Sequence, residues 1–213
     1  MYKIKAKDYG KMTGKLQGIR SISSSPVDNP FCLHMSKNPN TICSKCYSIK
    51  MIESGYRSRC RPAWQKMGEL LADQILEKSE IKPCINTNCI RFNSHGEILN
   101  MNHLINLFTI SEVNSHAICA LFTKRSDLLR QLDNSLLTPG NLIIVYSNPL
   151  IDSPLAVEEV DKKGFRYSKI FNVFTKEYAM NKGISINCGG KKCKDCMVCY
   201  SQNNINVINE LVK

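Results

Sequence analysis

Apolar runs of strand length alternate with segments of helical period from about residue 16 to residue 188. This alternation is typical of α/β proteins, in which helices connect parallel strands. Residues 117–122 are apolar without interruption, as in a strand buried on both faces. We therefore expect an α/β fold, a partial (β/α) barrel of about six parallel strands with a cysteine-rich C-terminal tail. The predicted strands are Leu16–Ser23, Cys84–Asn93, His116–Phe122, Leu142–Ser147, Lys169–Thr175 and Ile184–Asn187.

The connections between these strands carry helix signals. A helix is expected to start at Pro62 and to end near Lys78, and others are expected around residues 101–108, 126–136 and 176–181. The segment between the first strand and Pro62 is expected to be a long loop. A chain of 213 residues suits one domain with one core. We divide it into a barrel with an N-terminal cysteine loop, residues 1–187, and a metal-binding tail, residues 188–213.

Three cysteines in the predicted loop form the first candidate metal site. Cys43 and Cys46 are separated by two residues, and Cys32 lies ten residues before Cys43. A pair at this spacing can bind one metal from a tight turn, and three thiolates leave the fourth coordination position open for a ligand. Tyr47 follows the last cysteine. The alternative is a closed zinc site that His34 or another cysteine completes.

Four more cysteines in INCGGKKCKDCMVCY form the second candidate site. Four thiolates within twelve residues can close a metal site, and two glycines free the backbone between the first two. A closed site favours a structural or electron-relay role over catalysis. The spacing fits zinc and an iron–sulfur cluster equally well. The members are Cys188, Cys193, Cys196 and Cys199.

Polar residues follow the predicted strands and are the candidates for binding a cofactor. In parallel barrels the reactive groups lie beyond the carboxyl ends of the strands. Taken alone, His95 is typical of a surface histidine and Glu97 of a solvated acid in a first helical turn. The strand-end candidates are Asn93, Ser94, His95, Gly96, Glu97, Ser147 and Asn148, with Thr123, Lys124 and Arg125 as further polar ends. Four other cysteines are expected to be structural, namely Cys60, Cys84, Cys89 and Cys119.

Composition bears on compartment and partner. No stretch approaches the roughly 20 apolar residues of a membrane span. We expect a protein of a reducing cytoplasm, where closely spaced cysteines bind metals more often than they form disulfides. Residues 1–61 contain 12 Lys and Arg against three acids. This charge favours a nucleic acid or another polyanion as partner, and solubility is the alternative explanation. Motifs for nucleotide triphosphate hydrolysis and serine hydrolase chemistry are absent from the sequence.

Five segments between about residues 12 and 200 resemble the bacteriophage family called gene product eighty-eight. They are SISSSPVDNPFC, NTICSKCY, IRFNSHGE, LFTKR and INCGGKKCKDCMVCY. The resemblance implies a phage-encoded, cysteine-rich protein of the host cytoplasm.

The order of the motifs also resembles, more distantly, the radical S-adenosylmethionine enzymes. There, three cysteines after strand one hold a [4Fe-4S] cluster that binds the methionine end of the cofactor, and a motif after strand two receives its amino group. The resemblance implies that Cys32, Cys43 and Cys46 hold the cluster and that Gly96 and Glu97 lie beside the methionine. The first cysteine interval is longer here than in that superfamily, and Tyr47 follows the last cysteine, where the superfamily has an aromatic residue before it.

We therefore expect an iron–sulfur protein that resembles radical S-adenosylmethionine enzymes, with its substrate open. The alternative is a zinc-stabilised nucleic-acid-binding phage protein without catalytic activity, which the basic segment and the alternating Arg57, Arg59 and Arg61 favour. A third option is an inactive barrel that serves as an interaction module.

Overall fold

The computed structural model describes residues 1–133 and 135–212 and contains one seven-stranded sheet with the order β1-β2-β3-β4-β5-β6-β7. Strand β1 is antiparallel to β2, and every later neighbour is parallel. The α/β class and the mainly parallel sheet expected from the sequence are confirmed. The sheet is open, with β1 and β7 at its two edges. The strands are β1 (Gly10–Lys11), β2 (Arg20–Ile22), β3 (Cys89–Phe92), β4 (Ile118–Thr123), β5 (Leu142–Ile151), β6 (Lys169–Phe174) and β7 (Val207–Leu211).

Helices connect the parallel strands. The α-helices are α1 (Pro30–Ser36), α2 (Tyr47–Glu53), α3 (Arg61–Asp73), α4 (Met101–Val113), α5 (Ser126–Gln131), α6 (Val157–Asp161), α7 (Lys176–Asn181) and α8 (Cys193–Cys196). The 3-10 helices are η1 (Ala6–Asp8), η2 (Gly14–Leu16), η3 (Ile42–Lys45), η4 (Ser58–Cys60), η5 (Lys78–Glu80) and η6 (Val198–Tyr200).

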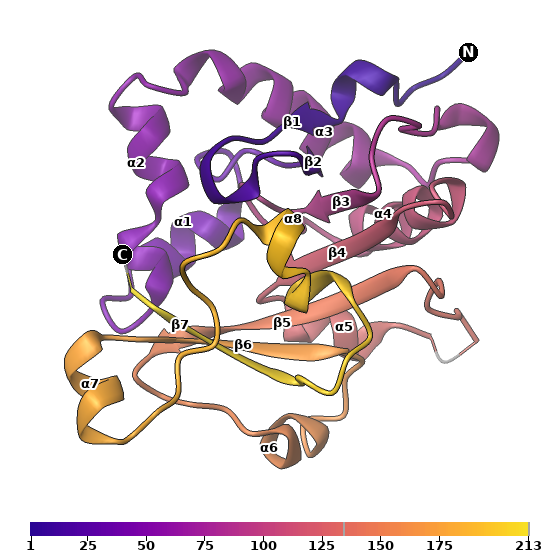
Figure 1. Ribbon diagram of the computed structural model, residues 1–213. Coiled ribbons are helices and arrows are strands. Elements are labelled where there is room, and N and C mark those ends of the chain that lie inside the picture. Colours follow the sequence, from indigo (N-terminus) through magenta and orange to yellow (C-terminus); the bar gives the residue numbers. More distant parts are fainter. Residues whose placement is uncertain (134, 213) are drawn as a thin grey trace.

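The two faces of the sheet are covered by different parts of the chain (Figure 1). Parallel strands in consecutive order with right-handed crossovers send their connections to one face. Helices α3, α4 and α5 lie behind the sheet in this view, and the tail that carries α8 passes in front of it. The larger core cluster lies under the helices, around residues such as Leu104, Leu121 and Ile144. A smaller cluster around Ala120, Val145 and Tyr200 lies on the other face.

The sixth predicted strand, Ile184–Asn187, is wrong. The strand beside β6 is β7, from the asparagine-rich end of the tail. Residues 184–188 lie outside β7 instead, where the N–H groups of Asn187 and Cys188 donate to the carbonyl of Asn209 at 3.2 and 3.0 Å. The apolar content of the two segments is similar, so the local pattern did not distinguish β7 from residues 184–187.

Other elements differ from the prediction in length. The first strand is shortened to Arg20–Ile22 because η2 occupies its beginning, and the helices at α3 and α5 end earlier than expected. The predicted cysteine loop is largely helical, since it contains α1, η3 and α2. Pro30 is the first residue of α1, where its missing N–H costs no hydrogen bond, and Asn29 accepts hydrogen bonds from the N–H groups of Phe31 and Cys32.

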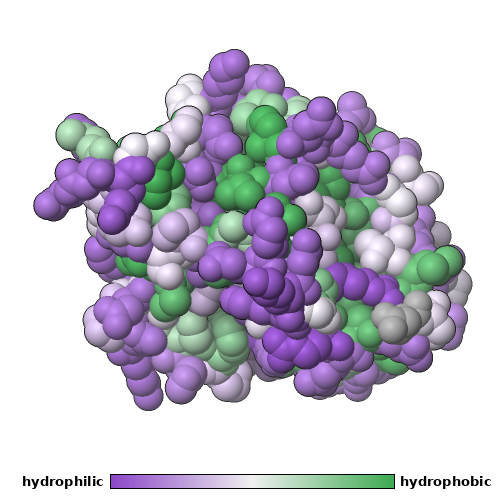
Figure 2. Space-filling model, turned by 90° about the horizontal axis from the view of Figure 1, so that it is seen from below, coloured by the Kyte–Doolittle hydropathy of each residue, from purple (hydrophilic) through white to green (hydrophobic). Residues whose placement is uncertain are grey.

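The described residues contain no helix long and apolar enough to cross a membrane. The face drawn in Figure 2 is hydrophilic over most of its area, with apolar side chains grouped near its middle.

Candidate functional site

One cavity of about 790 Å³ lies at the carboxyl ends of the parallel strands and is lined by members of both cysteine groups. Because these ends meet at one edge of a parallel sheet, residues that follow different strands converge there. The lining includes Ser21 of β2 and Ser23 just after it, residues 93–97 after β3, Lys124 after β4 and Ser147 of β5. The cysteines that line it are Cys32, Cys43, Cys46, Cys60, Cys188, Cys193 and Cys199.

The first cysteine group is positioned by three short helices. Cys32 lies in the first turn of α1, Cys43 lies in η3, and Cys46 is the residue before α2. The chain between them is fixed to β5, since Thr41 bridges to Leu150 and the carbonyl of Asn40 accepts from the N–H of Ile151 at 3.1 Å. All three thiols therefore reach the same cavity although ten residues separate the first two.

The tail cysteines surround a second, small cavity of about 20 Å³. Cys188, Cys193, Cys196 and Cys199 all line it, and all but Cys196 also line the large cavity. Met197, in the left-handed region at φ 56°, turns the chain from α8 into η6 so that Cys199 faces the same space. A space of this volume suits a single ion or water molecule.

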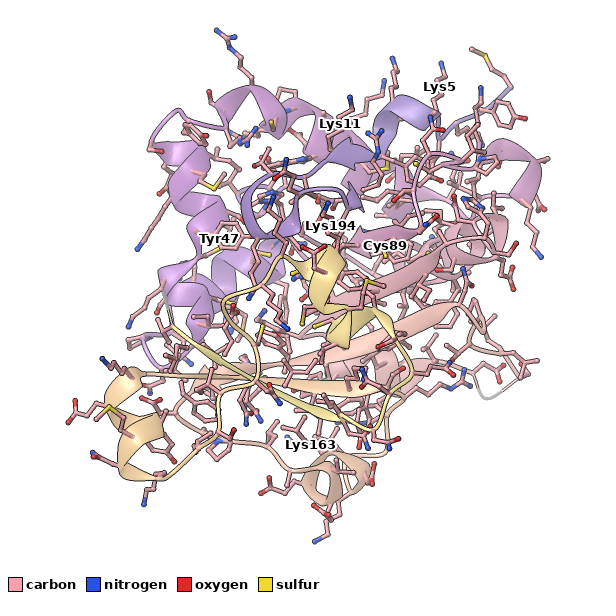
Figure 3. The ribbon with its side chains drawn as sticks, in the orientation of Figure 1. Lys5, Lys11, Tyr47, Cys89, Lys163 and Lys194 are labelled. Atoms are coloured by element: carbon pink, nitrogen blue, oxygen red, sulfur yellow. The ribbon has the colours of Figure 1, made fainter. Side chains whose placement is uncertain are left out.

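The N-terminal segment holds the tail in place. The ammonium of Lys15 donates to Cys188 Sγ at 3.1 Å and pairs with Glu210 of β7 at 2.6 Å. The aliphatic stem of Lys194 packs over Gly18, at which a Cβ would overlap this stem. Figure 3 shows Lys194 on α8 in front of the sheet, near the N-terminal segment.

The described side chains include no group of three or more His, Cys, Asp or Glu that is already arranged to hold a metal ion. Burial raises the pKa of Cys32, Cys43, Cys188 and Cys193, and it raises the pKa of Cys199 to about 12. Metal binding needs thiolates, so it must release protons from these groups.

Two cations lie among the thiols and oppose this effect of burial. Lys124 lowers the pKa of Cys32 and Cys43, and Arg91 lowers that of Cys193 and Cys199. Each cysteine group therefore has a positive side chain close enough to favour its thiolates. The donor set and these cations fit a thiolate-bound metal, although the thiols must rearrange to bind one.

Glu97 is buried, 4% exposed, and joins three parts of the site. Its Oε1 accepts from Thr123 Oγ1 at 2.8 Å and from Asn93 Nδ2 at 3.2 Å. The N–H of Ile98 also donates to Oε1 and that of Lys124 to Oε2. Burial raises the pKa of this carboxyl, against the effect of Lys124 and of these donors. The interpretation of Glu97 as a solvated acid is wrong, because its carboxylate links the ends of β3 and β4.

The carbonyl of Glu97 connects the same segment to the first cysteine group. It accepts from Ser24 Oγ and from Asn29 Nδ2, both at 2.8 Å. Gly96 has φ +72°, and a Cβ there would overlap the carbonyl and hydroxyl of Ser24. The glycine therefore allows the end of β3 to approach the end of β2, and Asn93 turns the chain at φ 56°.

His95 lies in an aromatic wall of the cavity and is 8% exposed, so its interpretation as a surface histidine is wrong. Its ring stacks on Trp64 with the centroids 4.1 Å apart, and its Nδ1 hydrogen-bonds Ser48 Oγ at 2.9 Å. Burial, with Arg57 and Arg91 nearby, lowers the pKa of His95 to about 4, which keeps it neutral at pH 7. The Tyr47 hydroxyl donates to the carbonyl of Ser94 at 2.5 Å.

Of the remaining predicted residues, Ser94 and Ser147 line the cavity and Asn148 does not. Ser94 accepts from the Ser21 hydroxyl at 2.8 Å and, like Ser147, lines the cavity. Asn148 is 2% exposed, and its amide donates to the carbonyl of Ser153 at 2.5 Å and to Asn172 Oδ1 at 3.1 Å. It therefore braces the irregular end of β5.

Sequence reasoning missed Arg91, Trp64 and Cys60 as cavity residues. Arg91 is a charged residue inside the apolar strand β3, and this was the available signal. Trp64 belongs to the apolar face of a helix, which concealed its contact with His95. Cys60 is partly exposed, whereas Cys84, Cys89 and Cys119 are buried.

Comparison of the chain with protein-family models, with curated proteins and with solved structures finds no match. The fold and the cavity are therefore the basis for assigning a function.

Proposed function

We propose that this protein is an iron–sulfur protein that resembles radical S-adenosylmethionine enzymes, built on a partial (β/α) barrel. The observation that carries the proposal is the opening of both cysteine groups onto one cavity at the carboxyl ends of parallel strands. Catalytic centres of parallel barrels lie at this end. The proposal includes the resemblance to the phage family and a location in the host cytoplasm.

In this proposal Cys32, Cys43 and Cys46 hold a [4Fe-4S] cluster. A cluster with three cysteine ligands leaves one iron open to bind and reduce a cofactor, which is the chemistry it supplies. Lys124 favours the thiolates, and the hydrogen bonds of Glu97 fix the segment after β3 beside them. A second metal, as an iron–sulfur cluster or as zinc, is held by the four tail cysteines, Cys188, Cys193, Cys196 and Cys199. This metal holds the tail against the sheet.

The order of elements supports the same proposal. The first cysteine group follows β2, the first parallel strand, and the motif with Gly96 and Glu97 follows β3. S-Adenosylmethionine would bind beside this motif. Tyr47, Asn93, Ser94, His95 and Ser147 would be further cavity residues, and Asn148 would brace the end of β5 beside them.

The metal and sulfide content of protein purified without oxygen tests the proposal. We expect iron and acid-labile sulfide, and a change in the electron paramagnetic resonance spectrum of the reduced protein when S-adenosylmethionine is added. Cys43→Ala should lose the first cluster, whereas Cys119→Ala, at a buried cysteine of the core, should retain both sites. Protein that holds zinc alone and a spectrum that the cofactor leaves unchanged would overturn the enzyme proposal.

The second candidate is a zinc-stabilised nucleic-acid-binding protein. Its support is the placement of Lys11, Lys15, Lys45 and Arg57, all from the basic segment, around the cavity. Electrophoretic mobility shifts with single- and double-stranded DNA and RNA at low salt test it, since phosphate contacts weaken as salt rises. A protein that retards none of these nucleic acids would exclude it.

A further inference from the structure

The large cavity is lined by more positive than negative side chains. Among the described residues, six Lys and Arg side chains line it, against two carboxylates. The cations are Lys11, Lys15, Lys45, Arg57, Arg91 and Lys124, and the carboxylates are Glu97 and Glu210. Four of the six cations belong to residues 1–61, so a third of the 12 Lys and Arg residues of the basic segment line this one space.

Most of these cations have no carboxylate partner. Lys15 pairs with Glu210, and the ion pairs among residues 1–133 and 135–212 include none of the other five. Glu97 accepts its hydrogen bonds from Thr123, Asn93 and two backbone N–H groups, so its carboxylate is already engaged. A partly buried cation without an anion costs free energy, and an anionic occupant would offset this cost.

Arg91 is a cavity cation that belongs to a central strand of the sheet. It projects from β3, and its guanidinium carbon lies 3.6 Å from the centroid of the Phe122 ring. Its Nε and the Tyr200 hydroxyl of the tail are both buried without a hydrogen bond of ordinary geometry, and the two side chains lie close enough for Tyr200 to raise the pKa of Arg91. A guanidinium presents donors in a fixed fork that matches a phosphate or a carboxylate.

Aromatic side chains also line the cavity. Trp64, Tyr47 and Phe31 line it, and Trp64 stacks on His95. A cavity that combines an aromatic wall with positive side chains suits an organic anion better than a bare ion.

We propose that this cavity binds a small organic oxyanion, a phosphate or a polycarboxylate, whose negative group is held by Arg91 and Lys124. The proposed ligand is distinct from the metals, and its binding does not require that either metal site is filled. Arg91 lies between Phe122 and Tyr200 of the tail and lines the cavity.

The protein carries its own reporter for this site, because Trp64 is its single tryptophan and lines the cavity. The full chain, purified anaerobically in low salt, is titrated with adenosine monophosphate, inorganic pyrophosphate and citrate while Trp64 fluorescence is recorded. We expect a saturable change with at least one of them that weakens as salt is added. Preference for the nucleotide over pyrophosphate indicates a phosphate ligand with a ring, and preference for citrate indicates a polycarboxylate.

Three variants locate the anion. Arg91→Gln should weaken binding about tenfold or more, because hydrogen bonds to charged groups contribute about 1.5–3 kcal/mol. Arg57→Gln removes a cavity cation from the turn before η4 and should weaken binding less. Lys163→Gln is the matched control, since Lys163 is exposed and lies far from α8 in Figure 3. Circular dichroism, metal content and sulfide content are measured on each variant.

Four outcomes overturn the proposal. The first is the absence of a saturable change with all three probes. The second is equal affinity in wild type and in a folded Arg91→Gln variant. The third is loss of metal from Arg91→Gln with unchanged anion affinity, which would assign Arg91 to the tail thiolates. The fourth is tighter binding of a single-stranded oligonucleotide than of the mononucleotide, which would identify a nucleic-acid site.

Discussion

The helix-covered face and the cysteine-covered face of the sheet are built on different principles. Among the described residues, the cluster under the helices contains 27 buried apolar side chains and the one under the tail contains seven. The first face is therefore held by apolar burial over a wide area. The second is covered by a short segment that includes four cysteines and is fixed by contacts of Lys15 and Lys194.

This difference shows how one sheet can support a stable core and an open site together. Small apolar clusters with few partners are the parts of a protein that open at low free-energy cost. A thiolate-bound metal can supply the stability that the tail lacks, because metal binding and folding are coupled. The comparison leads to four predictions.

Metal removal should have the largest effect, and it should be confined to the cysteine-covered face. Structural zinc contributes on the order of 10 kcal/mol in isolated small domains. After chelation we expect residues 188–212 to lose hydrogen-exchange protection while α4 keeps its own, as measured by mass spectrometry. Equal protection of the tail before and after metal loss would show that packing alone holds it.

Two adjacent isoleucines on β5 lie on opposite faces of the sheet, so substituting each one compares the contribution of the two faces to stability. Ile144 belongs to the helix-covered cluster and Ile143 to the cysteine-covered one, and both are nearly inaccessible. Ile144→Ala should cost about 4 kcal/mol of unfolding free energy and Ile143→Ala nearer to about 2 kcal/mol, because the sparser side can collapse into the space. Denaturant unfolding of both metal-free variants measures this difference. A larger loss at Ile143 would reverse the comparison.

A histidine on α4 should make the helix-covered face sensitive to acid. His103 is 1% exposed, and burial, with Arg125 nearby, lowers its pKa from 6.5 to about 3. The unfolded chain takes up this proton below pH 6.5 and the folded chain does not. Stability should therefore fall as the pH falls from 6.5 toward 3, by about 1.4 kcal/mol for each pH unit from this group.

His103→Gln should make the unfolding free energy depend less steeply on pH. Denaturant unfolding between about pH 7 and about pH 4, which covers the titration of histidine in an unfolded chain, measures this change. His34→Gln, at an exposed position, is the matched control. A slope that His103→Gln leaves unchanged would contradict the prediction.

Gly96→Ala is the most local change of the four, and it acts where the ends of β2 and β3 meet. The added Cβ would overlap Ser24 at a positive φ, so we expect a loss of more than about 1 kcal/mol. Gly183→Ala is the matched control, since Gly183 has φ +62° and open space around its Cβ position. Both variants carry the strain of an alanine at positive φ, but only Gly96→Ala adds the overlap with Ser24. Thermal unfolding of both variants therefore isolates the contribution of the overlap. Equal losses of stability would mean that Ser24 moves aside at little cost.

Much of the fold follows from local patterns. Apolar alternation located the four strands from β3 to β6 and the helix Lys176–Asn181, because periodicity and capping act within a few residues. The polar residues after β3 and β4 were recognisable for the same reason. The antiparallel β1 was missed, since two residues carry too little periodic signal.

The sequence by itself determined the parallel α/β class, the two cysteine groups and the polar strand ends, because each depends on residues that are close together in the sequence. The tertiary structure alone decided that β7 replaces residues 184–187 beside β6 and that both cysteine groups share one cavity. It also decided that Arg91 and Lys124 lie among the thiols. These relations join residues up to a hundred positions or more apart, and only the packing of the whole chain selects among the pairings that local patterns allow.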